Sequence, residues 1–508
     1  MSSLFSKIAK IMQSDPERIF ANLPDGRYYR AQDVLDVSAR FANVLSLTGV
    51  VPGDRVAVQV EKSIEAVMLY LATLRAGAVF LPLNTGYTPA EIEYFLDDAQ
   101  PALFVCDPAK ADELKPVADK AGAKLETLGG WQAYEMPEGT FADNGLEAST
   151  EFAEVERGPR DLAAICYTSG TTGRSKGAML SHENLISNAE TLIEAWGITA
   201  DDVLIHALPI YHVHGLFVAL NTVLLSGASM IFQGGFAPGD VLDAMDHATM
   251  MMGVPTYYTR LLAEDGLTVD KTANMRLFIS GSAPLLAETF DQFEQRAGHR
   301  ILERYGMTET GMNTSNPLMG ERRSGTVGPA LPGVEARIAD VDGTILKAGD
   351  IGVLEVRGPN VFQGYWQMPE KTAEEFRDDG FFITGDLATI DEDGYITIVG
   401  RNKDLIITGG LNVYPKEIET VIDDMAGVGE SAVIGVPHPD FGECVIAVIA
   451  GSNGKLTEDQ VITNAKTKLA SFKVPKQVFF IDALPRTSMG KVQKNILRKT
   501  HEALFTEE

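Results

Sequence analysis

The feature that most constrains the fold is the alternation of strand-like and helix-like segments along the N-terminal part of the chain. Residues 55–60 (RVAVQV) have the alternating pattern of a strand, residues 62–78 have helical spacing, and residues 102–107 (ALFVCD) again resemble a strand. Residues 88–91 (TPAE) predict a helix start, because they provide an N-cap threonine, a first-turn proline and a capping-box glutamate. This alternation predicts parallel sheets covered by helices.

The pattern changes after about residue 325, where short β segments joined by tight turns follow. A smaller α+β unit then begins near Arg401, with the order helix, strand, strand, helix, strand, helix. We therefore predict an α/β protein of several subdomains, divided into a domain of residues 1–400 and a domain of residues 401–508.

Charge and cysteine content exclude several classes of protein. The 508 residues include 43 Lys and Arg against 70 Asp and Glu, a net charge of −27, which argues against nucleic-acid binding through a broad basic face. Cys106, Cys166 and Cys444 have no C-x-x-C spacing, so we expect neither a disulfide framework nor a zinc cluster, and a cytoplasmic location. Residues 203–239 contain no Asp, Glu, Lys or Arg, but polar residues and glycines interrupt them, so we predict a buried helix and strand rather than a membrane span.

A segment rich in glycine, serine and threonine directly follows the apolar run LAAIC. Residues 167–177 (YTSGTTGRSKG) combine glycines, whose backbone N–H groups can converge on phosphate oxygens, with hydroxyl donors and the charge of Lys176. A Walker A loop would need Ser or Thr after the lysine, where Gly177 stands, so a kinase-type NTPase is disfavoured. The alternative is a flexible surface loop, but the length of the run and its lysine favour a phosphate-binding loop.

Further motifs follow in order along the chain. Residues 303–310 (ERYGMTET) offer an aromatic face for a base, a hydroxyl for a phosphate and a carboxylate for Mg²⁺. Residues 384–386 (TGD) and 400–404 (GRNKD) precede the glycine-containing residues 409–415. Residues 485–491 (PRTSMGK) place a lysine on a glycine turn before the final helix. Together with the phosphate loop, these motifs indicate a nucleotide site.

In this order and spacing, the motifs resemble those of the adenylate-forming superfamily of acyl-CoA synthetases, luciferases and peptide-synthetase adenylation domains, over essentially the whole chain. The resemblance implies a large N-terminal domain of βαβαβ subdomains with a distorted β-barrel, and a small mobile α+β C-terminal domain that carries the catalytic lysine. It also implies ATP and coenzyme A as co-substrates and Mg²⁺ as cofactor. A carboxylate and ATP would give an acyl-adenylate and pyrophosphate, and a thiol would then attack the adenylate to give a thioester and AMP.

The resemblance also implies roles for individual residues. Lys491 would bridge the attacking carboxylate and the α-phosphate, and physics agrees, since attack of one anion on another needs a cation between them. Glu309, with Thr168, would bind Mg²⁺, and Thr308 would contact the α-phosphate. The residues expected to bind ATP are Thr168, Ser169, Gly170, Thr171, Thr172, Gly173, Lys176, Gly281, Ser282, Ala283, Pro284, Arg304, Tyr305, Gly306, Thr308, Asp386, Arg401 and Lys491.

Within that set, residues 281–284 and 304–306 would shape the adenine pocket, while Asp386 would hold the ribose with help from Arg401.

One arrangement cannot serve both half-reactions well, because Lys491 is needed beside the α-phosphate first and a thiol must reach the carbonyl afterwards. The superfamily rotates its C-terminal domain about a hinge that corresponds to Lys403. This rotation would remove Lys491 and bring Gly409 and Gly410 to a channel for coenzyme A.

Selection of the acid would depend on residues 208–215 (LPIYHVHG) and 254–260 (VPTYYTR). His212 would close over the reacting carboxylate, and the planar cation of Arg260 would suit a second carboxylate. The alternative is that Arg260 begins a helix and points to solvent. Both segments resemble the malonyl-CoA synthetase branch, which favours malonate, with methylmalonate as a second candidate. The expected substrate-binding residues are His212, Arg260, Ser282 and Met307, the last of which would limit bulk on the central carbon.

Free coenzyme A is the expected acceptor, because the C-terminal end of the chain leaves no room for a carrier domain. The alternatives are a synthetase for another short acid and a stand-alone adenylation enzyme that loads a carrier protein. A catalytically inactive nucleotide sensor is a third alternative, against which Lys491 and Glu309 argue. We expect no nucleic-acid or membrane partner, and we include a protein acyltransferase or deacylase acting on Lys491 among the expected partners.

Overall fold

The computed structural model describes residues 3–130, 138–168, 175–408, 411–439, 441–452, 456–487 and 490–505. The chain separates into two compact units. The first unit contains Met1–Glu335 and Arg357–Phe376, and the second contains Ala336–Val356 and Arg377–Glu508. The predicted boundary between residues 400 and 401 therefore lies inside the second unit, and as a boundary between parts that move it stays a prediction.

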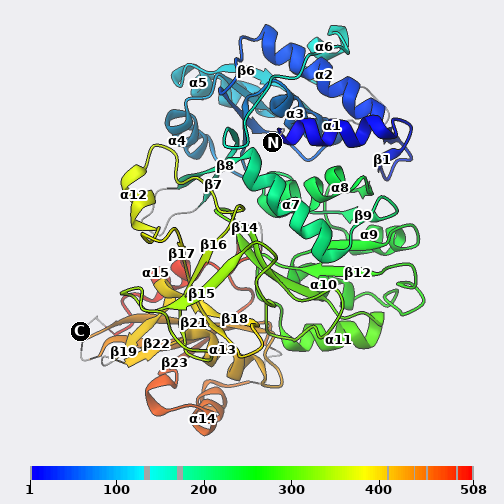
Figure 1. Ribbon diagram of the computed structural model, residues 1–508. Coiled ribbons are helices and arrows are strands. Elements are labelled where there is room, and N and C mark those ends of the chain that lie inside the picture. The colour runs from blue at the N-terminus through cyan, green and yellow to red at the C-terminus, as the bar shows by residue number, and fades with distance from the viewer. Residues whose placement is uncertain are drawn as a thin grey trace. The chain divides into compact units, whose positions relative to one another are not determined.

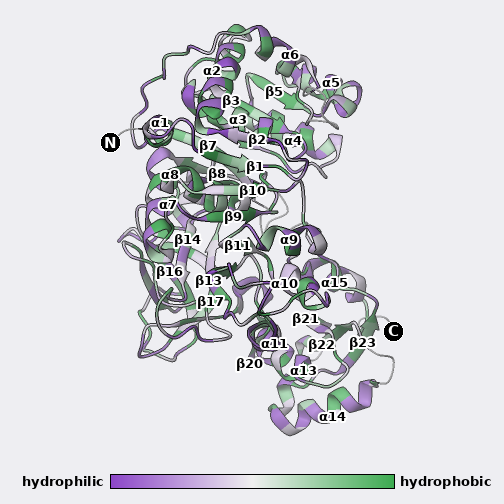
Figure 2. Cartoon of the chain, turned by 90° about the vertical axis from the view of Figure 1, so that its right-hand side faces the viewer, coloured by the Kyte–Doolittle hydropathy of each residue, from purple (hydrophilic) through white to green (hydrophobic). Residues whose placement is uncertain are grey.

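A six-stranded sheet of the first unit confirms the predicted parallel pattern (Figure 1). Its order is β6-β5-β3-β4-β7-β8, and all neighbours are parallel except β7 and β8. Strand β5 is hydrophobic along its length (Figure 2) because helices cover both faces of a parallel sheet. The strands are β3 (Arg55–Gln59), β4 (Val79–Pro82), β5 (Leu103–Cys106), β6 (Lys124–Thr127), β7 (Leu162–Thr168) and β8 (Lys176–Ser181).

The other large sheet of the first unit has the order β14-β13-β12-β11-β9-β10-β1-β2. Its inner pairs are parallel, whereas β14 and β2 pair antiparallel at the two edges. The strands are β1 (Ile19–Asn22), β2 (Tyr28–Arg30), β9 (Val203–His206), β10 (Ser229–Phe232), β11 (Met250–Gly253), β12 (Leu277–Ser280), β13 (Leu302–Met307) and β14 (Gly311–Ser315).

Helices connect these strands, and their starts follow the sequence signals. The Glu91 carboxylate accepts the N–H of Thr88 at 2.8 Å, while the Thr88 hydroxyl accepts the N–H of Glu91 at 3.4 Å, so the capping box is confirmed. The helices are α1 (Leu4–Ser14), α2 (Ala31–Leu47), α3 (Ile64–Arg75), α4 (Pro89–Ala99), α5 (Ala111–Lys120), α6 (Thr140–Glu147), α7 (His182–Trp196), α8 (Asn221–Ser226), α9 (Pro238–Met245), α10 (Pro255–Leu262), α11 (Ala287–Ala297) and α12 (Pro369–Glu374).

The uncharged run 203–239 forms β9, a π-helical segment (His214–Leu220), α8 and β10, and it is largely buried. Among the described residues, no helix is both long enough and apolar enough to span a bilayer.

The second unit begins with a four-stranded sheet of order β15-β16-β17-β18, in which β17 pairs antiparallel with β16 and with β18. This order is that of an open sheet, and the distorted barrel stays a prediction. The strands are β15 (Glu335–Ala339), β16 (Gly352–Arg357), β17 (Phe382–Ile390) and β18 (Ile396–Arg401).

The last part of the second unit is the predicted α+β unit. Its two longest strands, β21 (Glu430–His438) and β22 (Gly442–Ala450), pair antiparallel, and both of their faces are buried. This burial explains the continuous apolar run CVIAVIA. Helix α14 shows hydrophilic and hydrophobic residues together (Figure 2), as expected of a surface helix. The other elements are β19 (Ile406–Thr408), β20 (Leu411–Val413), β23 (Gln477–Ile481), α13 (Pro415–Asp423), α14 (Glu458–Lys468) and α15 (Lys494–His501).

Candidate active site

Five side chains of the first unit form a polar cluster around the buried carboxylate of Glu309. One carboxylate oxygen of Glu309, Oε1, accepts a hydrogen bond from the Thr168 hydroxyl at 3.4 Å and lies 3.1 Å from the Tyr365 hydroxyl. The Tyr365 hydroxyl also lies 2.6 Å from Glu375 Oε2. Lys176 Nζ donates to the other oxygen of Glu375 at 2.9 Å. We call these five residues the carboxylate–lysine cluster.

Backbone pairing brings the members of this cluster together. Residues 362–366 run antiparallel to the edge strand β8, and the Trp366 N–H donates to the carbonyl of Gly177 at 2.7 Å. The Phe362 N–H donates to the carbonyl of Glu309 at 2.8 Å. The same short segment therefore fixes the backbone beside Glu309 and beside the β8 strand, which begins at Lys176.

The charges of the cluster are set by burial and by the neighbouring groups. Burial and the charge of Glu309 raise the pKa of Tyr365 far above its usual value, so the phenol stays protonated. Burial also acts to raise the pKa of Glu375, but the hydrogen bonds from Tyr365 and Lys176 and the charge of Lys176 outweigh it, and the net pKa is lowered. The ammonium of Lys176 also lies 3.9 Å from the centroid of the Tyr365 ring. Glu375 is therefore an anion held against a lysine.

The residues around Glu309 fit a magnesium ion. One carboxylate and two hydroxyl groups supply hard oxygen donors at one point. Among the described residues no group of three or more His, Cys, Asp or Glu side chains is placed to hold a metal. Mg²⁺ usually binds through one or two carboxylates and completes its shell with waters and substrate phosphates, and Glu309 can provide one such carboxylate.

A second cluster surrounds Gly281, in the loop after β12. A methyl group at this position would lie 2.4 Å from Cζ of Arg304, so only glycine leaves room for the guanidinium. Arg304 is buried, and its Nε and Nη2 have no hydrogen-bond partner among the residues that the structure describes. Burial lowers the pKa of Arg304 to about 9. Next to Gly281, Ser282 has a φ of +73°, and its hydroxyl lies 3.1 Å from Nδ1 of the buried His214. The cluster thus holds a buried cation with unused donors next to Gly281, and a serine hydroxyl at the following position of the chain.

Arg260 lies on α10 and is exposed. Its guanidinium carbon is 4.9 Å from the centroid of the Phe236 ring. That ring in turn stacks on Tyr257 with centroids 3.8 Å apart. Arg260 is thus held by an aromatic stack, and its predicted contact with the acid stays a prediction.

The other residues predicted to bind the acid or the nucleotide in this unit are partly accessible. The half-buried His212 accepts the His214 N–H on its Nδ1 at 3.4 Å, and the Tyr305 hydroxyl lies 3.9 Å from Sδ of Met307. The remaining predicted residues, in the loop after β12 and on or after β13, are Ala283, Pro284, Gly306 and Thr308.

In the second unit, the predicted ribose residues and the predicted hinge adjoin two ion pairs. The buried carboxylate of Asp386 on β17 lies 2.6 Å from Nε of Arg401, its register partner on β18. Lys403 is exposed on a short 3₁₀ turn (Asn402–Asp404). On the far side of it, Asp404 accepts a hydrogen bond from Arg498 on α15 at 2.5 Å. Each side of the predicted hinge is thus tied to a different element.

Lys491 is exposed in the second unit, and its N–H donates to the Thr487 hydroxyl at 3.2 Å. Several predicted residues lie outside the described part of the chain, namely Ser169, Gly170, Thr171, Thr172, Gly173, Gly409 and Gly410. The roles assigned to them stay predictions.

Comparison with known families decides the class of this protein. The family described as AMP-binding enzyme matches residues 9–366, and the family described as AMP-binding enzyme C-terminal domain matches residues 417–491. The chain belongs to the AMP-binding enzyme family. The large N-terminal and small C-terminal parts expected from the sequence are confirmed by this match.

Individual relatives of this AMP-binding enzyme span nearly its whole length. It is 37% identical over 489 residues to the malonate–CoA ligase of Arabidopsis thaliana, covering 89% of this chain and 79% of the relative. A feruloyl-CoA synthase of Amycolatopsis is 36% identical over 466 residues, with 91% of each chain covered. The crystal structure of ATP-bound MatB from Rhodopseudomonas palustris is 56% identical, with a TM-score of 0.96 and coverage of 99% of this chain and all of that one.

The sequence motifs miss three residues that the structure places in these clusters. Tyr365 and Glu375 belong to none of the motifs, and Glu375 lies 199 positions from Lys176 in the sequence. His214 lies within residues 208–215 but has no predicted role of its own; it is buried and contacts Ser282. The sequence gives only a weak signal for Glu375. A buried Lys176 would need an acidic partner to balance its charge, but the sequence does not indicate which acidic residue that partner is.

Proposed function

We propose that this AMP-binding enzyme ligates malonate to coenzyme A, with methylmalonate as a second substrate. In the first half-reaction a carboxylate oxygen of malonate attacks the α-phosphorus of ATP, and the bond to pyrophosphate breaks. In the second half-reaction the thiol sulfur of coenzyme A attacks the carbonyl carbon of the adenylate and loses its proton. AMP leaves, and malonyl-CoA is formed.

The observation that carries the choice of acid is the buried guanidinium of Arg304. Its unused Nε lies beside Gly281, the chain neighbour of Ser282, which is a residue assigned to the acid from the sequence. A buried cation with free N–H groups suits a second carboxylate and disfavours an apolar acyl chain, because buried donors that have no acceptor are costly. We therefore assign Arg304 to the distal carboxylate of malonate, in place of the adenine contact expected from the resemblance. Arg260, exposed on α10, is the alternative for this role.

The names of the relatives support a CoA-ligase reaction, but they identify the acid substrate only in part. The plant malonate–CoA ligase and the feruloyl-CoA synthase are 37% and 36% identical to this chain, so this level of identity does not separate a dicarboxylate from an aryl acid. The 56% identity to MatB over the whole chain, together with Arg304, favours malonate.

The carboxylate–lysine cluster supplies the groups for pyrophosphate release. Lys176 would neutralise the β- and γ-phosphates, and Glu309, with Thr168, would hold Mg²⁺. When bound, Mg²⁺ supplies positive charge that stabilises the leaving pyrophosphate. Lys491 would neutralise the charge that develops between malonate and the α-phosphate.

Domain rotation about Lys403 is part of this proposal. Arg401 is tied to Asp386 before the hinge, and Asp404 is tied to Arg498 after it. The two ion pairs would confine a backbone rotation to the residues between them. Gly409 and Gly410 would then reach the coenzyme A channel.

Two further expectations belong to the proposal. The three cysteines are buried free thiols, which is compatible with a cytoplasmic location. Lys491 is exposed, as a lysine must be to serve as the substrate of a protein acyltransferase or deacylase.

AMP formation with a panel of acids tests the proposal. The panel is acetate, malonate, methylmalonate, succinate, butyrate and benzoate, each with ATP, Mg²⁺ and coenzyme A. We expect malonate to be the preferred acid, and we expect Arg304→Ala to lose about a hundredfold in kcat/KM for malonate while its activity with butyrate is kept or increased. Arg260→Ala is the matched arginine variant. If only Arg260→Ala lost activity with malonate, the distal carboxylate would be assigned to Arg260 instead. A wild-type preference for a monocarboxylate would refute the choice of malonate.

A further inference from the structure

Lys176 has a carboxylate partner that no sequence motif provides. Its side chain is 10% exposed, and that of Glu375 is 19% exposed, so the pair is shielded from solvent. A lysine side chain has four rotatable methylene groups, and holding its ammonium at one place normally costs conformational entropy. In this structure the hydrogen bond to Glu375 and the Tyr365 ring hold the ammonium from two sides.

Glu375 is itself held in place. The Tyr365 hydroxyl contacts one of its oxygens at 2.6 Å, and Lys371 lies 3.2 Å from the other. The Thr372 hydroxyl accepts the N–H of Tyr365 at 2.9 Å, so the turn that carries Glu375 is tied to the same tyrosine. The carboxylate is therefore an anchored acceptor rather than a flexible surface group.

The donors of Lys176 are only partly used. An ammonium group has three N–H donors, and the described contacts of Lys176 are the hydrogen bond to Glu375 and the face of the Tyr365 ring. An anion can therefore be bound by Lys176 without breaking its bond to Glu375. A carboxylate that competed with phosphate for Lys176 would have to leave the lysine when phosphate binds. Glu375 can stay bound, so it can position the ammonium group instead of competing for it.

We propose that Glu375 is a positioning residue for ATP, which holds the Lys176 ammonium where the terminal phosphates bind. The inference rests on the ATP part of the proposed function and is independent of the identity of the acid. Glu375 acts through Lys176 and does not touch the nucleotide.

The consequences of removing Glu375 follow from this role. In Glu375→Ala the lysine must be ordered by ATP itself, so we expect the Kd for Mg–ATP and the KM for ATP to rise about tenfold, the value of one charge-assisted hydrogen bond. We expect kcat at saturating ATP to change by less than about twofold, because the bound lysine occupies the same place. Glu375→Gln keeps an acceptor for the lysine and should recover most of the affinity.

A double-mutant cycle with Lys176 tests the mechanism. Mg–ATP binding is measured by calorimetry on the full-length protein without any acid, so the result does not depend on whether malonate is the substrate. In the Lys176→Ala background, Glu375→Ala should cause no further loss, because the partner through which it acts is absent. Lys371→Ala, which removes the more exposed cation from the same carboxylate, is the control and should change the Kd by less than about twofold.

Three results would overturn the proposal. Tighter binding of Mg–ATP by Glu375→Ala would make Glu375 a competitor of the phosphates. Equal Kd values for wild type and Glu375→Ala would give it no role in binding. Losses that multiply in the double variant would mean that it acts without Lys176. If Glu375→Ala shows a lower thermal transition than wild type, the isosteric Glu375→Gln replaces it in the cycle. We then expect a smaller loss of Mg–ATP affinity when Lys176 is present and no loss in the Lys176→Ala background.

Discussion

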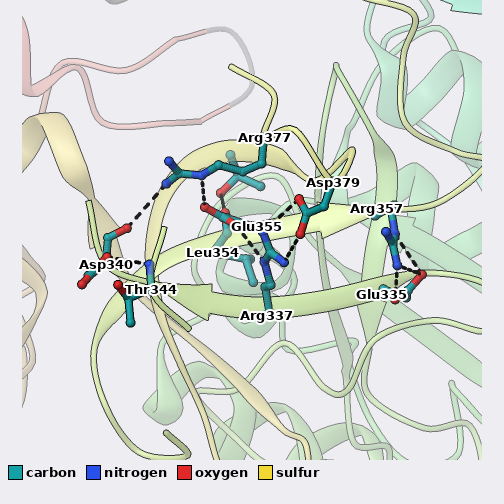
Figure 3. Close-up of polar contacts among 10 residues, drawn as sticks. Glu335, Arg337, Asp340, Thr344, Leu354, Glu355, Arg357, Arg377 and Asp379 are labelled. Atoms are coloured by element: carbon teal, nitrogen blue, oxygen red, sulfur yellow. Dashed lines mark hydrogen bonds and ion pairs between the residues drawn. The ribbon is translucent and has the colours of Figure 1, made fainter. Parts of the chain in front are cut away.

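Two carboxylates of this protein are each held by basic side chains, but the manner of holding differs. In the second unit, Glu355 accepts a hydrogen bond from Nε of Arg337 at 2.8 Å and from Nε of Arg377 at 2.7 Å (Figure 3). Arg337 also donates to Asp379 at 2.5 and 3.2 Å and lies 3.8 Å from the Phe381 ring centroid. We call Arg337, Glu355, Arg377 and Asp379 the arginine cluster.

Glu375 in the first unit has partners of another kind. It is bound by a lysine, and it shares the hydroxyl of Tyr365 with Glu309. One phenolic proton cannot satisfy two carboxylates, and a lysine has donors to spare. In the arginine cluster, planar forks span neighbouring carboxylates and pack on a ring. The difference separates a network that is complete without a ligand from one that has capacity left for a phosphate and a metal.

The largest expected effect comes from removing the centre of the arginine cluster. The side chain of Glu355 is fully buried, so Glu355→Ala removes the acceptor of the Nε–H group of both Arg337 and Arg377. We expect a loss of about 3–5 kcal/mol of stability, seen as a lower thermal transition of the full-length protein by calorimetry. The KM for ATP of the folded fraction should stay unchanged.

The exposed ion pair between Glu335 and Arg357 is the matched control, with side chains 61% and 42% exposed (Figure 3). Glu335→Ala should cost no more than about 1 kcal/mol, because exposed pairs are screened by water. Equal losses in the two variants would contradict the interpretation of the arginine cluster as a stabilising network.

Glu309→Gln should have the opposite profile. The amide keeps an oxygen that can accept from Thr168 and Tyr365, but the negative charge for Mg²⁺ is lost. We expect pyrophosphate release to fall about 10²–10³-fold, with a thermal transition within a few degrees of wild type. A stability loss as large as that of Glu355→Ala would mean that Glu309, like Glu355, mainly stabilises the fold. The two clusters would then not differ in the way proposed here.

How far the sequence predicts these features depends on the range of the interactions. The parallel strands were predictable, because burial on both faces makes runs such as β5 continuously apolar. The capping box at Thr88 was predictable too, because its partner is three residues away. The division into units was not, because Ala336–Val356 joins the second unit by strand pairing with residues after Phe376.

The site shows the same limit. Glu309 and Lys176 stand in motifs, so the sequence identifies them. Tyr365 and Glu375 reach them only because residues 362–366 pair with the edge of β8, and no local pattern announces that pairing. The buried state of Arg304 depends on the space left by Gly281, which the sequence does not reveal.

Glu65 extends the comparison to a carboxyl that is hydrogen-bonded to a tyrosine, Tyr29. The Tyr29 hydroxyl donates to Glu65 Oε1 at 3.0 Å, and burial raises the pKa of Glu65 from 4.5 to about 7. The folded state therefore prefers the protonated form of Glu65. The contribution of Glu65 to stability is complete below pH 4.5 and is lost as the pH rises through about 7.

Glu65→Gln should remove this pH dependence. At pH 8 we expect the variant to be more stable than wild type by about 2 kcal/mol, with the difference vanishing below pH 4.5. Thermal transitions of both proteins, measured from below pH 4.5 up to pH 8, check this expectation. If the stability of wild type and Glu65→Gln changed with pH in the same way, the Tyr29 hydroxyl alone would be enough to hold Glu65 in its ionised form. Lys176 would then not be what keeps Glu375 ionised.

The smallest expected effect tests whether the fork or the charge matters in the arginine cluster. Arg337→Lys keeps the charge beside Glu355 but cannot bridge Glu355 and Asp379 through separate nitrogens, and it loses the flat contact with Phe381. We expect a loss of about 1 kcal/mol, measured as a thermal shift of a few degrees. Lys371→Arg in the first unit is the converse change, and it should alter stability less, because Lys371 meets Glu375 as a point charge at 33% exposure. If Arg337→Lys is as stable as wild type, charge alone holds Glu355, and the two clusters differ only in burial.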